Sequence, residues 1–254
     1  MLIDPDTVAA AFADTAQHMF STASDGWLYR GAGVLAGATG APLAMLNGIW
    51  AESSDPDPGT VAEMLDRLAD SGLPHCMQLR PGSSDEIALK ARSRAMAQQE
   101  KIPLMVLEDP TRLSTASQLD GLTIRELSPA EGALHVRIAA GAFGMPEELF
   151  ARVVTPELLS LAGVHCYIGE VDGESVTTGM GVTLAQCVGI FNIATSSAHR
   201  GRGYGTAMTA RVASDGLAEG VGWAWLQSSP AGYGVYERLG FRTIERWDCW
   251  VREV

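Results

Sequence analysis

Apolar positions in the first 108 residues follow helical spacing in three stretches and strand-like spacing in the runs between them. Val8, Phe12 and Ala16 recur at helical spacing after Asp6, which we expect to cap the first helix. In chain order the pattern predicts a helix to residue 20, strands over 26–30, 33–38 and 42–51, a helix over 60–71, a strand over 74–79, a helix over 84–100 and a strand over 102–107. This order predicts a sheet that is covered by helices.

The second half of the chain begins the same order again. Ser128 and Glu131 have the spacing of a capping box, and Asp172-Gly173 is typical of a hairpin turn. In chain order the pattern predicts a strand over 122–127, helices over 130–142 and 146–161, strands over 164–171, 175–184 and 188–195, a helix over 207–220, a strand over 222–227, a helix over 232–239 and strands over 241–245 and 247–252. The three central strands predict an antiparallel meander.

A polar, turn-rich segment over residues 109–121 separates these two halves. We interpret it as a linker and expect one domain over residues 1–118 and a second over residues 119–254. The fold class that follows is α+β, with a mixed, mostly antiparallel sheet flanked by helices in two tandem domains.

Composition limits the classes of function. With 46% hydrophobic and 19% charged residues, the 254-residue chain is typical of a soluble globular protein. The net charge of −12 argues against a nucleic-acid partner, and the longest apolar runs are too short to predict a membrane span. Without an export signal or a C-x-x-C pair, the four cysteines predict reduced thiols, no metal site and a cytoplasmic location.

The most informative stretch is H-R-G-R-G-Y-G-T at residues 199–206, between a predicted strand and a predicted helix. Its three alternating glycines allow the backbone to approach a ligand closely. The N–H groups at the start of a helix attract anions, and Arg200 and Arg202 add charge suited to phosphate. The stretch therefore predicts a pyrophosphate-binding loop.

Three kinds of phosphate-binding loop have sequence patterns that this stretch could match. A Walker loop requires a lysine, and no lysine follows Lys101. A dinucleotide G-x-G-x-x-G pattern starting at Gly201 would end on Thr206 instead of glycine. The pattern R-x-x-G-x-G is met by Arg200, Gly203 and Gly205, and here the chain resembles the GNAT superfamily of acyl-CoA-dependent N-acyltransferases.

A second motif supports this resemblance. V-Y-E-R-L-G-F at residues 235–241 is similar to the helix-to-strand signature of the superfamily, in which a tyrosine stands four residues before Gly-Phe. The two motifs are correctly ordered, and the elements predicted for the second half match the GNAT order throughout. By contrast, Ser197 stands where a proline is common in the family.

The resemblance implies acetyl-CoA as acyl donor, no metal, and a set of residues that bind the coenzyme. These are the splayed-strand residues Ile193, Ala194 and Thr195, the loop residues Arg200, Gly201, Arg202, Gly203, Tyr204, Gly205 and Thr206, and Ser229, which replaces a frequent asparagine. The resemblance also implies direct transfer of the acetyl group to a primary amine, with Tyr236 as the general acid. The acceptor is expected to be a small molecule or a peptide.

The general base is left open, because residues 187–195 contain no carboxylate where many family members have a glutamate. Glu170, His165, His199 and a water-mediated route are the alternatives. A non-catalytic module that binds acyl-CoA for sensing is the alternative function.

Two further hypotheses concern the whole chain. The first half repeats the element order of the second, but its counterpart of the glycine loop, at residues 51–60, has no arginine. We therefore interpret it as a degenerate GNAT-like domain in tandem with an active one. Trp247 and Trp250 are expected on an exposed strand face that could support a homodimer.

Overall fold

The computed structural model describes residues 3–23, 26–113 and 119–253 and divides into two compact units. The first unit comprises Ile3–Leu104 and Thr243–Val254, and the second comprises Met105–Arg242. This division differs from the boundary expected at residue 118, because Leu113 packs in the core of the second unit and the last strand pairs within the first. Residues 114–118 of the expected linker lie outside the described residues.

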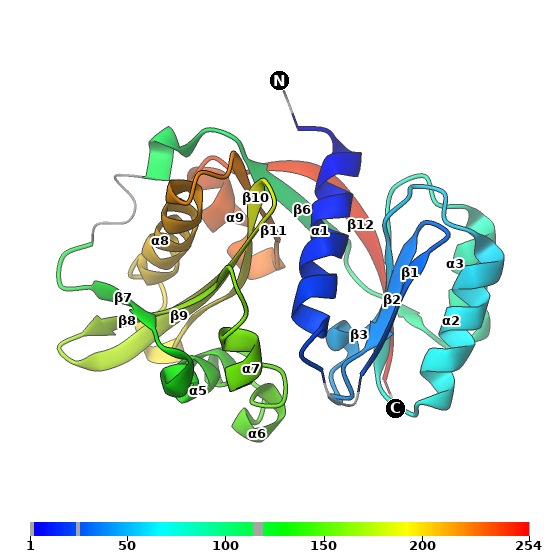
Figure 1. Ribbon diagram of the computed structural model, residues 1–254, viewed down its shortest axis with the longest axis horizontal. Coiled ribbons are helices and arrows are strands. Elements are labelled where there is room, and N and C mark those ends of the chain that lie inside the picture. Colours follow the sequence, from blue (N-terminus) through cyan, green and yellow to red (C-terminus); the bar gives the residue numbers. More distant parts are fainter. Residues whose placement is uncertain (1–2, 24–25, 114–118, 254) are drawn as a thin grey trace. The chain divides into compact units, whose positions relative to one another are not determined.

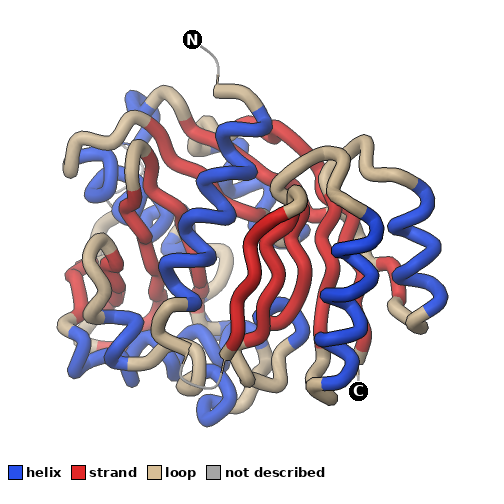
Figure 2. Tube along the Cα trace, turned by 45° about the vertical axis from the view of Figure 1, so that its right-hand side comes forward, coloured by secondary structure: helices blue, strands red, loops and turns tan. Residues whose placement is uncertain are grey.

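The first unit consists of one sheet with helices on its two faces (Figures 1 and 2). Its elements are α1 (Pro5–Phe20), β1 (Trp27–Gly31), β2 (Val34–Ala38), η1 (Ala44–Leu46), β3 (Asn47–Ala51), α2 (Pro58–Asp70), β4 (His75–Leu79), α3 (Asp85–Ser93), β5 (Ala97–Gln98), the start of β6 (Ile102–Leu107) and most of β12 (Arg242–Arg252). The strands follow the order β1-β2-β3-β4-β12, with β5 paired to β12. Only β3 and β4 run parallel within this series; its other pairs are antiparallel.

Alternation along the strands explains the two covered faces. Ile49 and Met77 point to the core under α2 and α3, where Leu65 and Leu68 are completely buried. Trp50, the neighbour of Ile49, points to the opposite face and contacts Phe12 of α1, with 6.5 Å between the ring centroids. The predicted helical faces of α1 and α2 are thereby confirmed.

Several predicted boundaries are wrong. Asp4, rather than Asp6, caps α1, because its carboxylate accepts a hydrogen bond from the Thr7 amide at 2.9 Å. The helix expected over residues 84–100 ends at Ser93, and its remainder includes β5. The two strands expected over residues 241–252 are one continuous strand, β12.

Trp247 and Trp250 are also placed differently from the expectation. Trp247 is fully buried against Phe12 of α1, with ring centroids 5.2 Å apart, and Trp250 is buried in the core under α2. The two tryptophans therefore stabilise the first unit and do not provide an exposed surface for a homodimer.

The second unit contains a sheet in the order β6-β11-β10-β9-β8-β7. Its elements after β6 are η2 (Pro110–Arg112), β7 (Thr123–Leu127), η3 (Pro129–Glu131), α5 (Gly132–Phe143), α6 (Glu147–Phe150), α7 (Pro156–Leu159), β8 (Val164–Val171), β9 (Glu174–Leu184), β10 (Cys187–Thr195), η4 (Ser197–His199), α8 (Tyr204–Ala218), β11 (Trp223–Gln227) and α9 (Pro230–Arg238). The capping box at Ser128 and the antiparallel meander β8-β9-β10 are confirmed. The helix expected over residues 146–161 is two short helices.

Helices α5 and α8 pack on opposite faces of this meander (Figure 1). Thr178 of β9 points to α5, where its hydroxyl lies 2.7 Å from Nδ1 of His135. Gly179 points to α8, and a Cβ at this position would lie 2.9 Å from the Met208 side chain. The missing side chain therefore lets α8 approach the sheet closely.

The two halves of the chain have the same order of elements. A hairpin, a third strand, a helix, a parallel strand, a helix and a final strand correspond to β1-β2-β3-α2-β4-α3-β6 in one half and to β8-β9-β10-α8-β11-α9-β12 in the other. The final strand β12 pairs with β4, and β6 lies beside β11. The repeated order predicted from the sequence is therefore confirmed, while each final strand adds to the sheet of the opposite half.

Candidate active site

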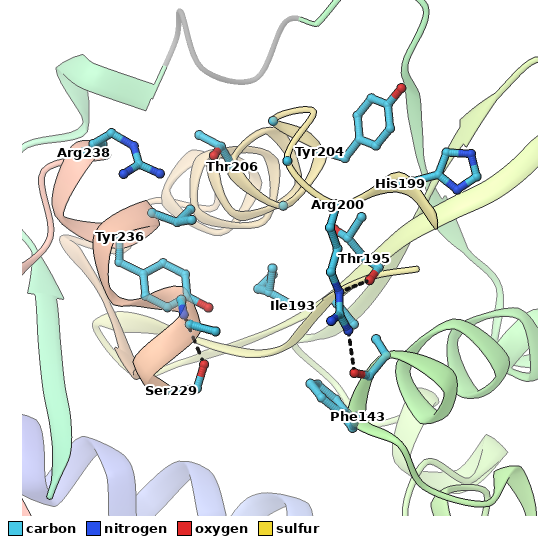
Figure 3. Close-up of a pocket in the computed structure, with 18 residues that line it drawn as sticks. Phe143, Ile193, Thr195, His199, Arg200, Tyr204, Thr206, Ser229, Tyr236 and Arg238 are labelled. Carbon is cyan, nitrogen blue, oxygen red and sulfur yellow. Dashed lines mark hydrogen bonds between the residues drawn. The ribbon is translucent and has the colours of Figure 1, made fainter. Parts of the chain in front are cut away.

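The second unit contains a cavity of about 690 Å³ where β10, α8 and α9 converge (Figure 3). Its lining residues are Ala142, Phe143, Ile193, Ala194, Thr195, His199, Arg200, Gly201, Gly203, Tyr204, Gly205, Thr206, Ser229, Ala231, Gly232, Val235, Tyr236 and Arg238. The structure therefore brings together all the residues proposed from the sequence to bind the coenzyme or donate a proton, with the exception of Arg202.

The cavity begins where two parallel strands separate. β10 pairs with β11 only over Cys187–Gly189, so the rest of its edge toward β11 has no strand partner. The pairing of β10 with β9 shifts between Phe191 and Ala194, and Asn192 in this bulge has a left-handed φ of 53°. Ile193 lies in this bulge, Ala194 and Thr195 follow it, and bulges of this kind re-aim the residues beside them.

The glycine loop leads directly into α8. Gly203 is the N-cap residue with a left-handed φ of 87°, and it has no side chain to bond the first N–H groups of the helix. Gly201 also has a positive φ, of 78°, and a Cβ there would meet no atom within 4 Å. The loop therefore borders open space at Gly201, and the helix start has no side-chain cap, which is an arrangement that fits a pyrophosphate.

The two loop arginines differ in their placement. Arg200 lines the cavity, but its Nη2 donates to the Ala142 carbonyl at 2.7 Å and its Nε donates to the Thr195 carbonyl at 3.3 Å. Arg202 is exposed and does not line the cavity. Arg200 therefore ties the end of α5 to the end of β10, and two of its five N–H donors are used by carbonyl groups.

The backbone of the splayed strand is partly engaged. The Ala194 carbonyl accepts a hydrogen bond of 2.8 Å from the Thr177 hydroxyl, and the Thr195 carbonyl accepts the bond from Arg200. Both carbonyls therefore already accept one side-chain hydrogen bond. Ile193 lies in the bulge, outside the registered pairs with β9.

Ser229 serves as the N-cap of α9. Its Oγ accepts a hydrogen bond from the Gly232 amide at 3.2 Å, as drawn in Figure 3. A hydroxyl can accept and donate at the same time, so the Ser229 proton is still available to a ligand in the cavity. The Ser229 side chain thus caps α9 and also forms part of the cavity wall.

Tyr236 projects from α9 into the cavity (Figure 3). Its ring packs edge-on against the Phe241 ring, with 6.1 Å between the ring centroids. A Cβ at Gly232 would lie 2.8 Å from the Tyr236 ring. Burial raises the pKa of the phenol to about 12, so the hydroxyl is protonated at neutral pH. Among the described residues its hydroxyl has no hydrogen-bond partner, so the proton can be directed to a ligand.

Only one of the three side chains considered as general base lies at the cavity. His199 lines it, with Nδ1 2.9 Å from the Ser196 hydroxyl, but Figure 3 shows it beyond Arg200 from Tyr236. His165 lies between Glu126 and Glu219, and Glu170 pairs with Arg125. Neither lines the cavity.

Sequence reasoning did not identify the contributions of α5 and of the end of α9. Phe143, with 47% of its surface exposed, and Ala142 reach the cavity from α5, which precedes the glycine loop by about 60 residues. Arg238 stands two residues after Tyr236, and this short spacing is the signal that could have found it. The structure thus adds a cation that the loop motif does not contain.

Two properties of the described residues concern other kinds of site. Within residues 3–23, 26–113 and 119–253, no group of three or more His, Cys, Asp and Glu side chains is placed to hold a metal ion. In the same part of the chain, none of the helices has both the length and the apolar character that crossing a membrane requires.

Comparison with known proteins agrees with this geometry. A model of the acetyltransferase (GNAT) domain matches residues 162–243, which include the splayed strand, the glycine loop and Tyr236. A search of curated proteins finds no match to the chain. Residues 162–243 therefore match a GNAT acetyltransferase domain, which supports an acetyltransferase.

Solved structures show the same fold over nearly the whole chain. A GCN5-related N-acetyltransferase from Kribbella flavida is 19% identical, with a TM-score of 0.72 over 97% of this chain and 96% of its own. A GCN5-related N-acetyltransferase from Sphaerobacter thermophilus has a TM-score of 0.61 and 14% identity over 89% of this chain and 75% of its own. A tandem GNAT protein from the clavulanic acid biosynthesis pathway has a TM-score of 0.59 and 14% identity over 98% of this chain and 95% of its own.

Proposed function

We propose that the protein transfers the acetyl group of acetyl-CoA directly to a primary amine of a small molecule or peptide. The observation that carries this proposal is that the start of α8, which has no side-chain cap, and the phenol of Tyr236 line the same cavity. The first feature fits the pyrophosphate of the coenzyme, and the second supplies a proton donor within the same cavity.

The residues of the chain have separable roles in this reaction. The amide groups of Gly203–Thr206 would hold the pyrophosphate, and the unpaired edge of β10 at Ile193 would orient the pantetheine arm. The coenzyme supplies a thioester carbon that a neutral amine can attack. Tyr236, protonated at neutral pH, would give its proton to the departing sulfur.

The charged side chains that line the cavity also indicate how the acceptor amine loses its proton. Its charged side chains are arginines, and His199 lies on the far side of Arg200 from Tyr236. We therefore favour removal of the acceptor proton through water, or an acceptor amine that reaches the cavity already neutral. A rate that rises with pH up to the pKa of the acceptor amine itself would agree with this route.

The first test is calorimetric titration with acetyl-CoA, followed by a thiol-release assay over a panel of amines. Binding together with amine-dependent thiol release would support the transferase. Binding without release for any amine in the panel would favour a non-catalytic acyl-CoA-binding module, and absence of binding would overturn both functions.

Replacement of Tyr236 by phenylalanine removes the proton donor and keeps the ring. Because general acid catalysis contributes about 10²-fold or more, we expect kcat to fall by about 100-fold while the affinity for acetyl-CoA changes by less than about twofold. Tyr233→Phe on the same helix is the matched control, because Tyr233 does not line the cavity. Equal rates for the wild type and Tyr236→Phe would exclude Tyr236 as the acid.

We also propose that the first half is a GNAT-like domain that has lost its coenzyme site. Arg80, with a side chain only 3% exposed, follows β4 and donates to the Glu52 carbonyl after β3 at 2.7 Å. It also pairs with Glu245, through nitrogen–oxygen distances of 3.0 and 2.9 Å. A buried guanidinium thus joins the ends of the two parallel strands that correspond to the splayed pair of the second half.

A further inference from the structure

We propose that Arg238, the last residue of α9, binds a phosphate group of acetyl-CoA and supplies the positive charge for which the sequence motif had indicated Arg200 and Arg202. This inference rests on the proposed use of acetyl-CoA. It concerns a residue of this chain, and binding can test it independently of turnover.

The loop arginines are poorly available for this task. Both hydrogen bonds of the Arg200 guanidinium go to backbone carbonyls, which hold α5 against the end of β10. Arg202 stands in the loop but outside the cavity lining. Of the two loop arginines, Arg200 reaches the cavity with its guanidinium held by two carbonyl groups, and Arg202 does not reach it.

Arg238 lies at the cavity and is available to bind a phosphate group. It lines the cavity and is exposed, and among the described residues it makes no ion pair or hydrogen bond. Figure 3 shows its side chain extending from α9 toward Thr206, in the first turn of α8. A guanidinium in this place would approach an anion at the helix start from the side opposite the glycine loop.

The shape of α9 favours this orientation. Side chains on a helix lean toward its N-terminus, and the residue one turn before Arg238 is Gly234. Nη1 of Arg238 lies 3.3 Å from the position that a Cβ of Gly234 would occupy. The bare helix surface at Gly234 therefore lets the guanidinium fold back along α9.

The charge of the whole chain makes a local cation important. At a net charge of −12, the protein as a whole repels a coenzyme that carries a pyrophosphate and a 3′-phosphate. Uncapped amides offer only partial charges. A full positive charge beside them would add to their attraction for a polyanion.

The test compares the calorimetric affinities of Arg238→Gln and Arg202→Gln for acetyl-CoA. We expect Arg238→Gln to weaken binding by about tenfold or more, since a hydrogen bond between two charged groups is lost. Arg202→Gln should weaken it by less than about threefold. Arg137→Gln, an exposed arginine of α5 that does not line the cavity, controls for the loss of one charge from the second unit.

Two further measurements identify the phosphate and exclude an indirect effect. A loss confined to acetyl-CoA and absent with 3′-dephospho-acetyl-CoA would assign Arg238 to the 3′-phosphate, and an equal loss with both would assign it to the pyrophosphate. Arg238→Lys should recover most of the affinity in either case. A loss that lysine does not restore, or a loss no greater than that of Arg202→Gln, would overturn the inference.

Failure of this inference can be distinguished from failure of the proposed function. A wild-type protein that binds no acetyl-CoA would contradict the proposed function itself. Tight binding by the wild type together with unchanged binding by Arg238→Gln would contradict only the role of Arg238.

Discussion

His135 shows how one buried residue connects α5 to the strand that forms the cavity. Thr178 donates its hydroxyl proton to the Tyr167 carbonyl at 2.6 Å, so its oxygen accepts from Nδ1 of His135 at 2.7 Å. The remaining ring nitrogen lies 3.5 Å from the Asn192 amide nitrogen in the β10 bulge. This chain of bonds requires a neutral histidine with its proton on Nδ1.

The neutral state of His135 predicts a pH-dependent stability. Burial lowers the pKa of His135 from 6.5 to about 4, so between these values the unfolded chain takes up a proton that the folded chain does not. The contribution of His135 to the free energy of unfolding is therefore fully present above pH 6.5. It falls by about 3 kcal/mol as the pH decreases toward 4. In urea unfolding, the stability difference between the wild type and His135→Gln should narrow from pH 7 to pH 4.5. A constant difference would contradict the assignment.

At the scale of one element, α8 depends on a positive-φ glycine at each end. Gly203 precedes the helix with a φ of 87°, and Gly220 follows it with a φ of 95°. A Cβ at Gly203 would meet Leu119 only at 3.7 Å, and a Cβ at Gly220 would meet no atom within 4 Å. The cost of a side chain at either position is therefore backbone strain rather than a collision.

The glycines at the two ends of α8 provide a matched pair of variants. Gly203→Ala and Gly220→Ala should each lower the free energy of unfolding by about 1–2 kcal/mol, because both force alanine into a left-handed conformation. Only Gly203→Ala should also weaken calorimetric binding of acetyl-CoA, since Gly203 lies in the cavity wall and Gly220 does not. Equal affinities in the two variants would exclude the glycine loop as the binding element.

At the scale of the whole molecule, the last strand of the chain completes the first unit. β12 pairs with β4, buries Trp250 under α2 and brings Glu245 to Arg80. The Glu245 carboxylate also accepts a hydrogen bond of 2.7 Å from the Trp247 indole. Residues separated by about 165 positions therefore form one buried polar cluster.

Neutralising Glu245 should destabilise this unit. Glu245→Gln leaves the buried Arg80 with the exposed Asp6 as its remaining carboxylate partner, and breaking such pairs costs about 3 kcal/mol. Glu253→Gln, at an exposed position after β12, is the control and should change the unfolding free energy by less than about 0.5 kcal/mol. Equal effects in urea unfolding would show that the Arg80–Glu245 pair contributes little.

Much of this architecture was predictable because the signals are local. The buried face of α2 follows from the spacing of Val61, Met64, Leu65 and Leu68, and the hairpin between β8 and β9 follows from Asp172-Gly173. Boundaries were less predictable where two local signals compete. Asp4 and Asp6 both stand at the start of the first helix, and only the folded backbone decides which carboxylate caps it.

The sequence by itself determined the repeated element order, the glycine loop before α8 and the tyrosine of α9, because turn chemistry and periodicity act between near neighbours. The tertiary structure decided which residues share the cavity and which strand joins which sheet. Arg200 bonds to Ala142, Arg238 faces the start of α8, and β12 pairs with β4 because these contacts join segments far apart in the chain. No local pattern encodes the distance between such segments, since it is set by packing of the whole core.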